Sequence, residues 1–425
     1  MTLVLVLVIF FGLLLLGCPI LMAIGAACAA WFAAFGNIPI LTVAQKIYTA
    51  TDSFTLMAVP FFMLAGQVME KTGITQKLVD FSEACIGWVR GGLACVVELA
   101  GMLMAGISGS SNADASALGA IMVRALKKGG YEDGWAVAIT SSAASIGPII
   151  PPSAVMIIYA NAAGLNIGKL FMGGVIPGIL LGIGYMVVCV IYAKRHNIPR
   201  TKFLGFKNLG IAFVKAIPAL IMPLIILGGI LLGVFTATES GCIASLYGIA
   251  YGLISKKVKF SDLPGCFKNA MVSSVAPLSL IAFSSLLSFA LAREGVTTAL
   301  ANFCAANIHS PFVLLLMVIL ICVIAGMFID NNATMLILTP IILPIVKSMG
   351  IDVMQFSMIF MIAIMSGGLT PPVGGLLFIT SSVDGIPLGK CIKPIVPFLI
   401  VVFAVMLLMC AFPIISTFIP NMVMG

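Results

Sequence analysis

Long apolar runs, separated by short polar or glycine- and proline-rich interruptions, fill this chain from one end to the other. A helix needs roughly 20 apolar residues to cross a hydrocarbon core of ~30 Å, and runs of that length recur throughout. Because a bilayer offers the backbone no hydrogen-bonding partners, such runs are expected to be helical. The pattern predicts an all-α polytopic membrane protein.

The runs predict an ordered set of elements in each half of the chain. The first half is expected to hold spans over Leu3–Phe35 and Ala44–Glu70, an amphipathic arm on the membrane surface over Lys71–Trp88, paired helices over Gly91–Ile107 and Ala115–Lys128, a broken span over Trp135–Ala160, and spans over Gly168–Ala193, Ile211–Gly233 and Glu239–Ile254. The second half is expected to hold a span over Lys268–Ala292, a short arm over Val296–Asn307, paired helices over Phe312–Ile329 and Ala333–Val346, a broken span over Val353–Ser382, and a last span over Leu388–Phe418.

Two regions of the chain repeat each other at a fixed spacing. Gly106, Asn112, Lys127, Gly130, Gly147 and Pro151-Pro152 recur 220 residues later as Gly326, Asn332, Lys347, Gly350, Gly367 and Pro371-Pro372. A further match joins Ile74–Phe81 to Val296–Phe303 at an offset of 222. The chain therefore consists of two copies of one unit. In membrane chains, paired segments interrupted by Gly and Pro at corresponding places point to a transporter's binding site.

Each pair of helices beside a polar turn is interpreted as a re-entrant hairpin. The limb over Ala115–Lys128 offers about 13 residues, which reach ~20 Å and cannot cross. Two ordinary spans joined by a polar loop are the alternative. The second pair of helices, taken alone, could be either a hairpin or two spans. Its match to the first pair favours a hairpin.

Lysine and arginine placement predicts the orientation, because cytoplasmic loops are enriched in these residues. With both hairpins re-entrant, 18 basic residues fall on one side and only Lys46, Lys169, Arg293 and Lys347 on the other. The first hairpin then enters from the cytoplasm and the second, flanked by His309 and Lys347, from outside, so the two units are inverted. Nine crossings put the N-terminus in the cytoplasm and the C-terminus outside.

Composition narrows the class of protein further. At 61% hydrophobic and 8% charged residues, the chain differs from soluble proteins, which have about 25% charged residues. The apolar N-terminus lacks a basic region and a cleavage site, which favours a first span over a cleaved signal. The 11 cysteines form no C-x-x-C pair and are interpreted as small buried residues. The net charge of +8 follows from the basic loops and indicates no nucleic-acid partner.

Enzyme motifs are missing from the sequence. Neither G-x-x-x-x-G-K-[ST] nor H-E-x-x-H occurs, so the chain is not expected to be an enzyme. An ion channel is the more serious alternative to a transporter. Opposed hairpins around a mid-membrane site favour alternating access over an open pore.

The candidate chemistry lies where the backbone is unwound. A helix broken in mid-membrane exposes carbonyl groups that attract cations and N–H groups that attract anions. Two cation sites are predicted, each pairing a break with a hairpin tip. The first comprises Gly147, Ile150 and Pro152 with Ser108, Ser110 and Asn112, and the second comprises Gly367, Thr370 and Pro372 with Asp330, Asn331 and Asn332. Oxygen donors that do not titrate near neutral pH favour sodium over protons.

Asp330 ends a long apolar run, and an intramembrane carboxylate is a functional-site candidate by default. Substrate hydrogen bonding or site organisation is favoured over a helix cap. For Asp52, Glu98, Asp114 and Glu239, capping or internal pairing is weighed equally with function, and Asp114 looks like an N-cap. His196 and His309 are expected to be solvated.

The stretch Gly106–Ala160 and its counterparts DNNATMLILTPIILPIVKSMGID and SGGLTPPVGGLLFITS resemble the large membrane subunit of tripartite ATP-independent periplasmic (TRAP) transporters, and the likeness covers essentially the whole chain. The resemblance implies sodium-coupled uptake of an organic acid across the bacterial inner membrane by an elevator motion. It implies two partners, a periplasmic substrate-binding protein and a small four-helix membrane subunit. Sialic acid is favoured as substrate and a C4-dicarboxylate comes second. A stand-alone anion symporter is a further alternative.

Carried over to this chain, the resemblance implies that Ser108, Ser110, Ser153 and Asp330 line the substrate site, with Asp52 a weaker candidate. It also implies a division into scaffold and transport parts. Residues 1–90 and 194–308 are expected to hold the scaffold spans and arms, whereas 91–193 and 309–425 hold the hairpins, the broken helices and the spans that follow them.

Overall fold

The computed structural model describes residues 2–35, 38–39, 41–200, 203, 205–308 and 310–424, and within these ranges every regular element is helical. His309 lies outside the described residues. Five described helices are long and apolar enough to cross a membrane, or six if one bent pair counts as a single span. The predicted all-α polytopic membrane fold is confirmed.

In the described residues of the first unit and of the region that links it to the second there are thirteen α-helices. They are α1 (Thr2–Leu15), α2 (Ile20–Phe35), α3 (Leu41–Thr51), α4 (Ala58–Lys71), α5 (Ile74–Ile86), α6 (Gly92–Ser108), α7 (Ser111–Leu118), α8 (Arg124–Lys128), α9 (Asp133–Ser145), α10 (Ala154–Ala163), α11 (Ile167–Arg195), α12 (Phe206–Leu231) and α13 (Ala237–Ile254). A 3-10 turn over Phe54–Met57 precedes α4, and a π-helical turn over Gly119–Val123 joins α7 to α8.

The second unit contains the remaining helices. They are α14 (Leu263–Arg293), α15 (Val296–Asn307), α16 (Pro311–Phe328), α17 (Asn331–Ser348), α18 (Val353–Gly367), α19 (Gly375–Ser382), α20 (Ile392–Ala411) and α21 (Ile414–Met424). Short 3-10 turns lie over Phe260–Asp262 and Leu388–Lys390. The predicted breaks at GPIIPPS and GGLTPPVG fall between α9 and α10 and between α18 and α19, and Pro151-Pro152 and Pro371-Pro372 are both cis.

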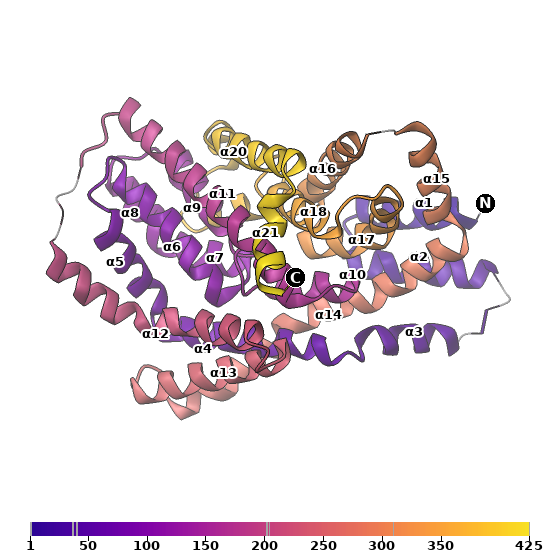
Figure 1. Cartoon of the computed structure of the whole chain (residues 1–425), viewed down its shortest axis with the longest axis horizontal. Coiled ribbons are helices and arrows are strands. Elements are labelled where there is room, and N and C mark those ends of the chain that lie inside the picture. Colours follow the sequence, from indigo (N-terminus) through magenta and orange to yellow (C-terminus); the bar gives the residue numbers. More distant parts are fainter. Residues whose placement is uncertain are drawn as a thin grey trace.

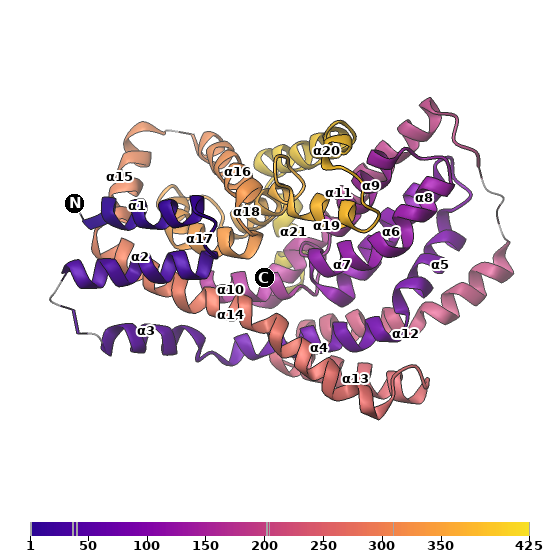
Figure 2. The same ribbon diagram turned by 180° about the vertical axis from the view of Figure 1, so that it is seen from behind.

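The prediction of one long span over Leu3–Phe35 is wrong. The helix stops after Leu15, Gly17 takes a left-handed conformation with φ of 79°, and Pro19 cannot continue a helical hydrogen-bond pattern. α2 then runs back beside α1 (Figures 1 and 2). A count of crossings that treats this segment as one passage therefore no longer fixes the side of the N-terminus.

Two other expected spans are also interrupted. The span over Ala44–Glu70 bends by 57° between α3 and the turn that precedes α4, at Asp52 and Ser53. The last span divides at Phe412 and Pro413, after which α21 packs along α11. Pro413 lacks the N–H that would continue α20, so the chain turns there.

The first hairpin forms, but its second limb is longer than its hydrophobicity indicates. The polar residues Ser111–Asp114 belong to the helix, so the limb runs without a break from Ser111 to Lys128. Eighteen residues reach ~27 Å, and limb length alone therefore does not exclude a crossing. The left-handed Gly109, with φ of 56°, turns the chain between α6 and α7.

The two units interlock in the middle of the molecule. α3, α4, α12, α13 and α14 run along the lower edge in both views, with the hairpins and broken helices above them (Figures 1 and 2). α10 packs against α17 of the second hairpin, while α19 packs against α7 of the first. The second half of each broken helix thus contacts the other unit, which brings the two hairpin regions together.

The amphipathic arms differ in their surroundings. On the first arm, the apolar residues Ile74 and Leu78 are buried, and α5 packs against α6 and α12. Its apolar face is therefore covered largely by protein. The second arm, α15, matches the predicted bounds Val296–Asn307 and packs against α14 and α17.

A network of ion pairs joins the two units at one surface. Asp384, in the turn after α19, pairs with Arg124 at 3.0 Å and Lys127 at 2.7 Å; Asp133 pairs with Lys127 at 3.3 Å and Lys390 at 3.2 Å. Hydrogen bonding from Lys127 lowers the pKa of Asp384, and hydrogen bonding from Lys390 lowers that of Asp133. Lys127 in turn has a raised pKa, mainly because of Asp384.

Candidate functional site

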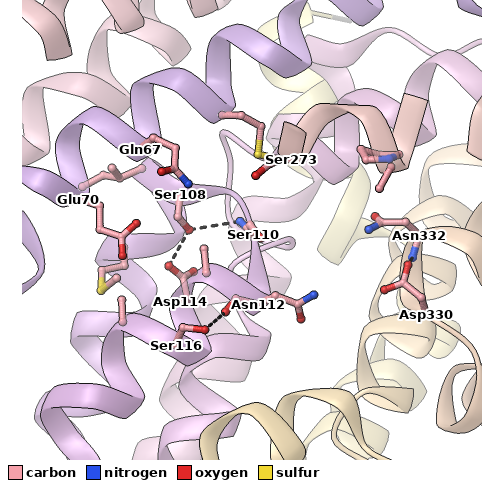
Figure 3. A pocket seen from close by; sticks show the side chains of 18 of the residues that line it. Gln67, Glu70, Ser108, Ser110, Asn112, Asp114, Ser116, Ser273, Asp330 and Asn332 are labelled. Carbon is pink, nitrogen blue, oxygen red and sulfur yellow. Dashed lines mark hydrogen bonds between the residues drawn. The ribbon is translucent and has the colours of Figure 1, made fainter. Parts of the chain in front are cut away.

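A cavity of about 640 Å³ lies among α4, α14 and the tips of both hairpins. Small-molecule sites have volumes of roughly 300–1,000 Å³, so it can hold a small organic ligand. Its polar wall is shown in Figure 3 and comprises Gln67, Glu70, Ser108, Ser110, Asn112, Asp114, Ser116, Ser273, Asp330 and Asn332. Five of the predicted site residues therefore line one cavity, namely Ser108, Ser110, Asn112, Asp330 and Asn332.

The first hairpin tip lies directly against the first broken helix. A β-carbon placed on Gly109 would approach the carbonyl oxygen of Pro152 to 3.1 Å and the amide nitrogen of Ala154 to 2.9 Å. Only a residue without a side chain allows this approach, and its positive φ adds the same requirement. The predicted pairing of the tip with the break around Pro152 is present in the fold.

Asp114 is not the helix cap that its sequence position suggests. Ser110 is the N-cap residue of α7 and makes no side-chain capping bond, whereas Asp114 lies in the first turn and is fully buried. Its Oδ1 accepts a hydrogen bond of 2.6 Å from Ser108 Oγ, and among the described residues its Oδ2 has no partner. A β-carbon on Gly147 would come within 2.5 Å of that Oδ2. Asp114 therefore places a buried carboxylate between the hairpin tip and the break.

The second hairpin meets the second broken helix through two glycines. A β-carbon on Gly367 would lie 2.5 Å from both Cα and the carbonyl carbon of Gly326. Nearby, Asn331 Nδ2 lies 3.7 Å from the Met365 sulfur, and Thr370 Oγ1 donates to the Ser366 carbonyl oxygen at 2.7 Å. Gly367, Thr370 and Asn331 thus belong to one neighbourhood, as predicted from the repeat.

Asp330 is a helix cap that also faces the cavity. It is the N-cap of α17, and its Oδ1 accepts hydrogen bonds from the backbone N–H groups of Asn332 at 3.0 Å and Ala333 at 3.4 Å. It also lines the cavity. Capping fixes the position of the carboxyl group and leaves Oδ2 available to a ligand.

Ser153 and Asp52 are not among the residues that line the cavity. Ser153 is fully buried and caps α10 by accepting a hydrogen bond from Met156 N at 3.3 Å. Asp52 is exposed at the bend after α3. Asp52 is therefore remote from the cavity wall, whereas Ser153 lies behind it, with its Cα 3.1 Å from the position of a β-carbon on Gly109.

The other carboxylates named from the sequence, Glu98 and Glu239, make hydrogen bonds within the protein and lie outside the cavity. Glu98 is fully buried on α6 and accepts a hydrogen bond of 2.8 Å from Ser142 Oγ. Glu239 completes a capping box with Thr236 at the start of α13. His196 stacks on Tyr192, and its Nδ1 lies 3.0 Å from the Tyr192 carbonyl oxygen.

Sequence reasoning missed the contribution of α4. Gln67 and Glu70 lie three residues apart on one face of this helix and line the cavity opposite the first hairpin. At the end of an apolar run beside Lys71, Glu70 resembled an ordinary flanking charge. The i, i+3 spacing of Gln67 and Glu70 was the available signal. Within the described residues no cluster of three or more His, Cys, Asp or Glu side chains could hold a metal ion.

Comparison with known proteins agrees with this arrangement. Residues 7–415 match the family model described as "Tripartite ATP-independent periplasmic transporter, DctM component". The C4-dicarboxylate TRAP transporter large permease protein DctM of Pseudomonas aeruginosa is 35% identical, over 91% of each chain. The 2,3-diketo-L-gulonate TRAP transporter large permease protein YiaN of Escherichia coli is 33% identical, over 95% of this chain and 96% of the relative.

A third relative is longer than this chain. The sialic acid TRAP transporter permease protein SiaT of Haemophilus influenzae is 35% identical over 89% of this chain, which spans 62% of that relative. Among solved structures, the YdaH transporter of Alcanivorax borkumensis has a similar fold, with a TM-score of 0.63 and 17% identity over 88% of this chain and 87% of that one. The fold is thus that of a membrane transporter, and the relatives are transport proteins rather than enzymes. This chain belongs to the family of TRAP transporter large permeases, the DctM component.

Proposed function

We propose that this chain carries an organic acid across the bacterial inner membrane, driven by a sodium gradient. The main support is that both hairpin tips, each set against its own broken helix, line a single cavity. Discontinuous helices that meet at one site are the usual construction of secondary transporters. The cavity is large enough for a small acid, and its hydroxyl and amide groups suit a carboxylate.

The first proposed sodium site lies where Asp114 faces the break at Gly147. A buried carboxylate oxygen without a hydrogen-bond donor is costly unless a cation or a proton neutralises it, and Asp114 Oδ2 is in this position. We assign to this site the residues named from the repeat, Ser108, Ser110, Asn112, Gly147, Ile150 and Pro152. Of these, Ser108 donates a hydrogen bond to Asp114 and Gly147 lies against its Oδ2. Oxygen donors of this kind suit a small hard cation.

The second proposed sodium site is at the contact of Gly326 with Gly367. Its proposed ligands come from Asp330, Asn331 and Asn332 at the tip and from Gly367, Thr370 and Pro372 at the break. Thr370 Oγ1 has a carbonyl partner in this structure, and an oxygen that donates its proton elsewhere keeps lone pairs for a cation.

Sialic acid is the favoured substrate and a C4-dicarboxylate is second. Relatives carry both names, and one carries that of 2,3-diketo-L-gulonate. Ser110 and Asn112 would bind the substrate carboxylate, and Asp330 would accept hydrogen bonds from its hydroxyl groups. Ser108 positions the neighbouring Asp114.

Family membership also suggests the assembly and the motion. We propose that a small membrane subunit and a periplasmic binding protein are required partners. The first hairpin would open to the cytoplasm and the second to the periplasm, where the C-terminus would also lie. Residues 91–193 and 309–425 would move as the transport part against a scaffold of 1–90 and 194–308 in an elevator mechanism.

Uptake in proteoliposomes tests this proposal. The chain is reconstituted with the small subunit, and the binding protein is added outside with labelled sialic acid. Uptake should require an inward sodium gradient, should stop when potassium replaces sodium, and should need no ATP. Omitting either partner should abolish it. Uptake by the chain alone would favour a stand-alone symporter, and uptake driven by a pH gradient without sodium would reject sodium coupling.

A further inference from the structure

The cavity is acidic in a way that the substrate class alone does not explain. Three carboxylates line it, Glu70, Asp114 and Asp330, and no lysine, arginine or histidine is among its described lining residues. Asp114 is fully buried, with Oδ2 unpartnered among the described residues. The proposed sodium ions would balance Asp114 and Asp330, so Glu70 is the carboxylate among these three to which no cation is assigned.

The carboxylates are distributed unevenly around the wall. Figure 3 shows the tip residues Ser108, Ser110, Asn112 and Asp114 in the middle, with Glu70 on one side and Asp330 on the other. With Asp114 neutralised by the proposed sodium ion, the middle offers neutral hydrogen-bond donors, because Asn112 carries an amide and Ser110 a hydroxyl. Both flanks offer exposed carboxylates, which accept hydrogen bonds and carry negative charge.

The N-terminus of α7 supports this division of the cavity wall into a neutral middle and acidic flanks. Ser110 makes no side-chain cap to the helix, whereas Asp330 caps α17 with its own carboxylate. Backbone N–H groups at a helix start favour an anion. A ligand carboxylate therefore fits at the first hairpin tip, and the remainder of the ligand extends towards a carboxylate on either side.

We propose that Glu70 is a specificity-determining residue that selects a hydroxyl-rich monocarboxylic acid and rejects the dicarboxylic acid of the same length. This inference rests on the proposed function and narrows its substrate class. A hydroxyl group donates a hydrogen bond to Glu70 or Asp330. A second carboxylate placed there has no proton to donate and is repelled by like charge.

Gluconate and glucarate test the proposal, because they share their internal hydroxyl groups and differ only in whether the sixth carbon is a hydroxymethyl or a carboxylate. Binding is measured by calorimetry on the complex of this chain and its small subunit in lipid nanodiscs containing sodium. The wild-type complex should bind gluconate roughly 10-fold or more tightly than glucarate. Glu70→Gln should reduce this ratio to within a few-fold of one, mainly by tightening the binding of glucarate.

Two variants separate a specificity role from a general effect. Glu70→Asp keeps the charge and should keep the preference for gluconate. Glu83→Gln makes the same chemical change at an exposed residue of α5 outside the cavity and should leave the ratio unchanged. Equal or tighter binding of glucarate by the wild-type complex would overturn the proposal, as would an unchanged ratio in Glu70→Gln.

The outcomes also distinguish this inference from the proposed function. Sodium-dependent binding of both acids with a ratio insensitive to Glu70 would retain organic-acid transport and reject only the role of Glu70. Absence of binding by either acid, in sodium as in potassium, would reject the hydroxyl-rich monocarboxylate assignment itself. Uptake of a C4-dicarboxylate would then remain open to the proteoliposome experiment.

Discussion

The contact between Gly326 and Gly367 gives the most direct test of how the second hairpin is held against its broken helix. We expect Gly367→Ala to destabilise the protein, because the new β-carbon would lie 2.5 Å from two backbone atoms of Gly326. Neither backbone can yield as a flexible side chain would. The two helices must separate by about 1 Å to restore an ordinary contact distance.

Overpacking a close contact of this kind costs about 1–3 kcal/mol. Alanine in place of glycine otherwise favours a helix by roughly 0.5–1 kcal/mol, so the net destabilisation should lie near 1–2 kcal/mol. Gly326→Ala should behave alike, because its β-carbon would meet the Ile364 carbonyl oxygen at 2.8 Å. Valine at position 367 should be worse than alanine, because two further carbons enter the same space.

Equilibrium unfolding in mixed micelles of rising SDS fraction measures this difference. Gly210→Ala is the matched control, because Gly210 lies inside α12 with nothing within 4 Å of a β-carbon; it should be neutral or slightly stabilising. The same variants should bind sodium more weakly if the glycine contact shapes the second site. Unfolding of Gly367→Ala at or above the wild-type SDS fraction would refute the close contact and the pairing built on it.

Other predictions address the cation sites, the orientation and the ion-pair network. Asp114→Asn should weaken sodium dependence at the first site, and Thr370→Ala should do so at the second with little loss of stability; sodium titrations of uptake that remain unchanged would reject both assignments. Cysteines placed at the corresponding positions Lys128 and Ser348, in a cysteine-free background, should react differently with an impermeant thiol reagent outside intact cells. Position 348 should be labelled and position 128 protected, and labelling of both would exclude inverted hairpins. Asp384→Asn should lower stability at pH 7, and the difference from wild type should shrink below about pH 4. The reason is that a carboxylate whose pKa is lowered by Lys127 stabilises the fold above the unfolded pKa and loses this contribution as pH falls through the folded pKa. A pH-independent difference in SDS unfolding would contradict it.

Periodicity and repetition in the sequence were enough to predict the helical membrane fold and most of its elements. Runs of apolar residues mark helices in a medium without hydrogen-bonding partners, so the bounds of α15 and the breaks around Pro151-Pro152 and Pro371-Pro372 could be read directly. The 220-residue offset paired each hairpin tip with its own break, and the contacts of Gly109 and Gly367 agree with both pairings.

The predicted spans were wrong where the hydrophobic pattern gives no sign that the chain changes direction. The segments Leu3–Phe35 and Leu388–Phe418 are apolar throughout, yet each turns at a proline and forms two helices. The second limb of the first hairpin was predicted to start too late because its first residues are polar rather than apolar. Polar residues at Ser111–Asp114 read as a loop, although a helix N-terminus accepts them readily.

The tertiary structure alone decided which polar residues lie near one another. The sequence could not show that Gln67 and Glu70 of α4 share a cavity with Asp330, because more than 250 residues of chain separate them and only packing brings them together. Nor could it show that Asp114 turns inward beside Gly147 while Asp330 caps its helix, since both lie near the start of the second limb of a hairpin. Local pattern determined which residues are helical and polar, and the packing of two interlocked units determined which of them face one another.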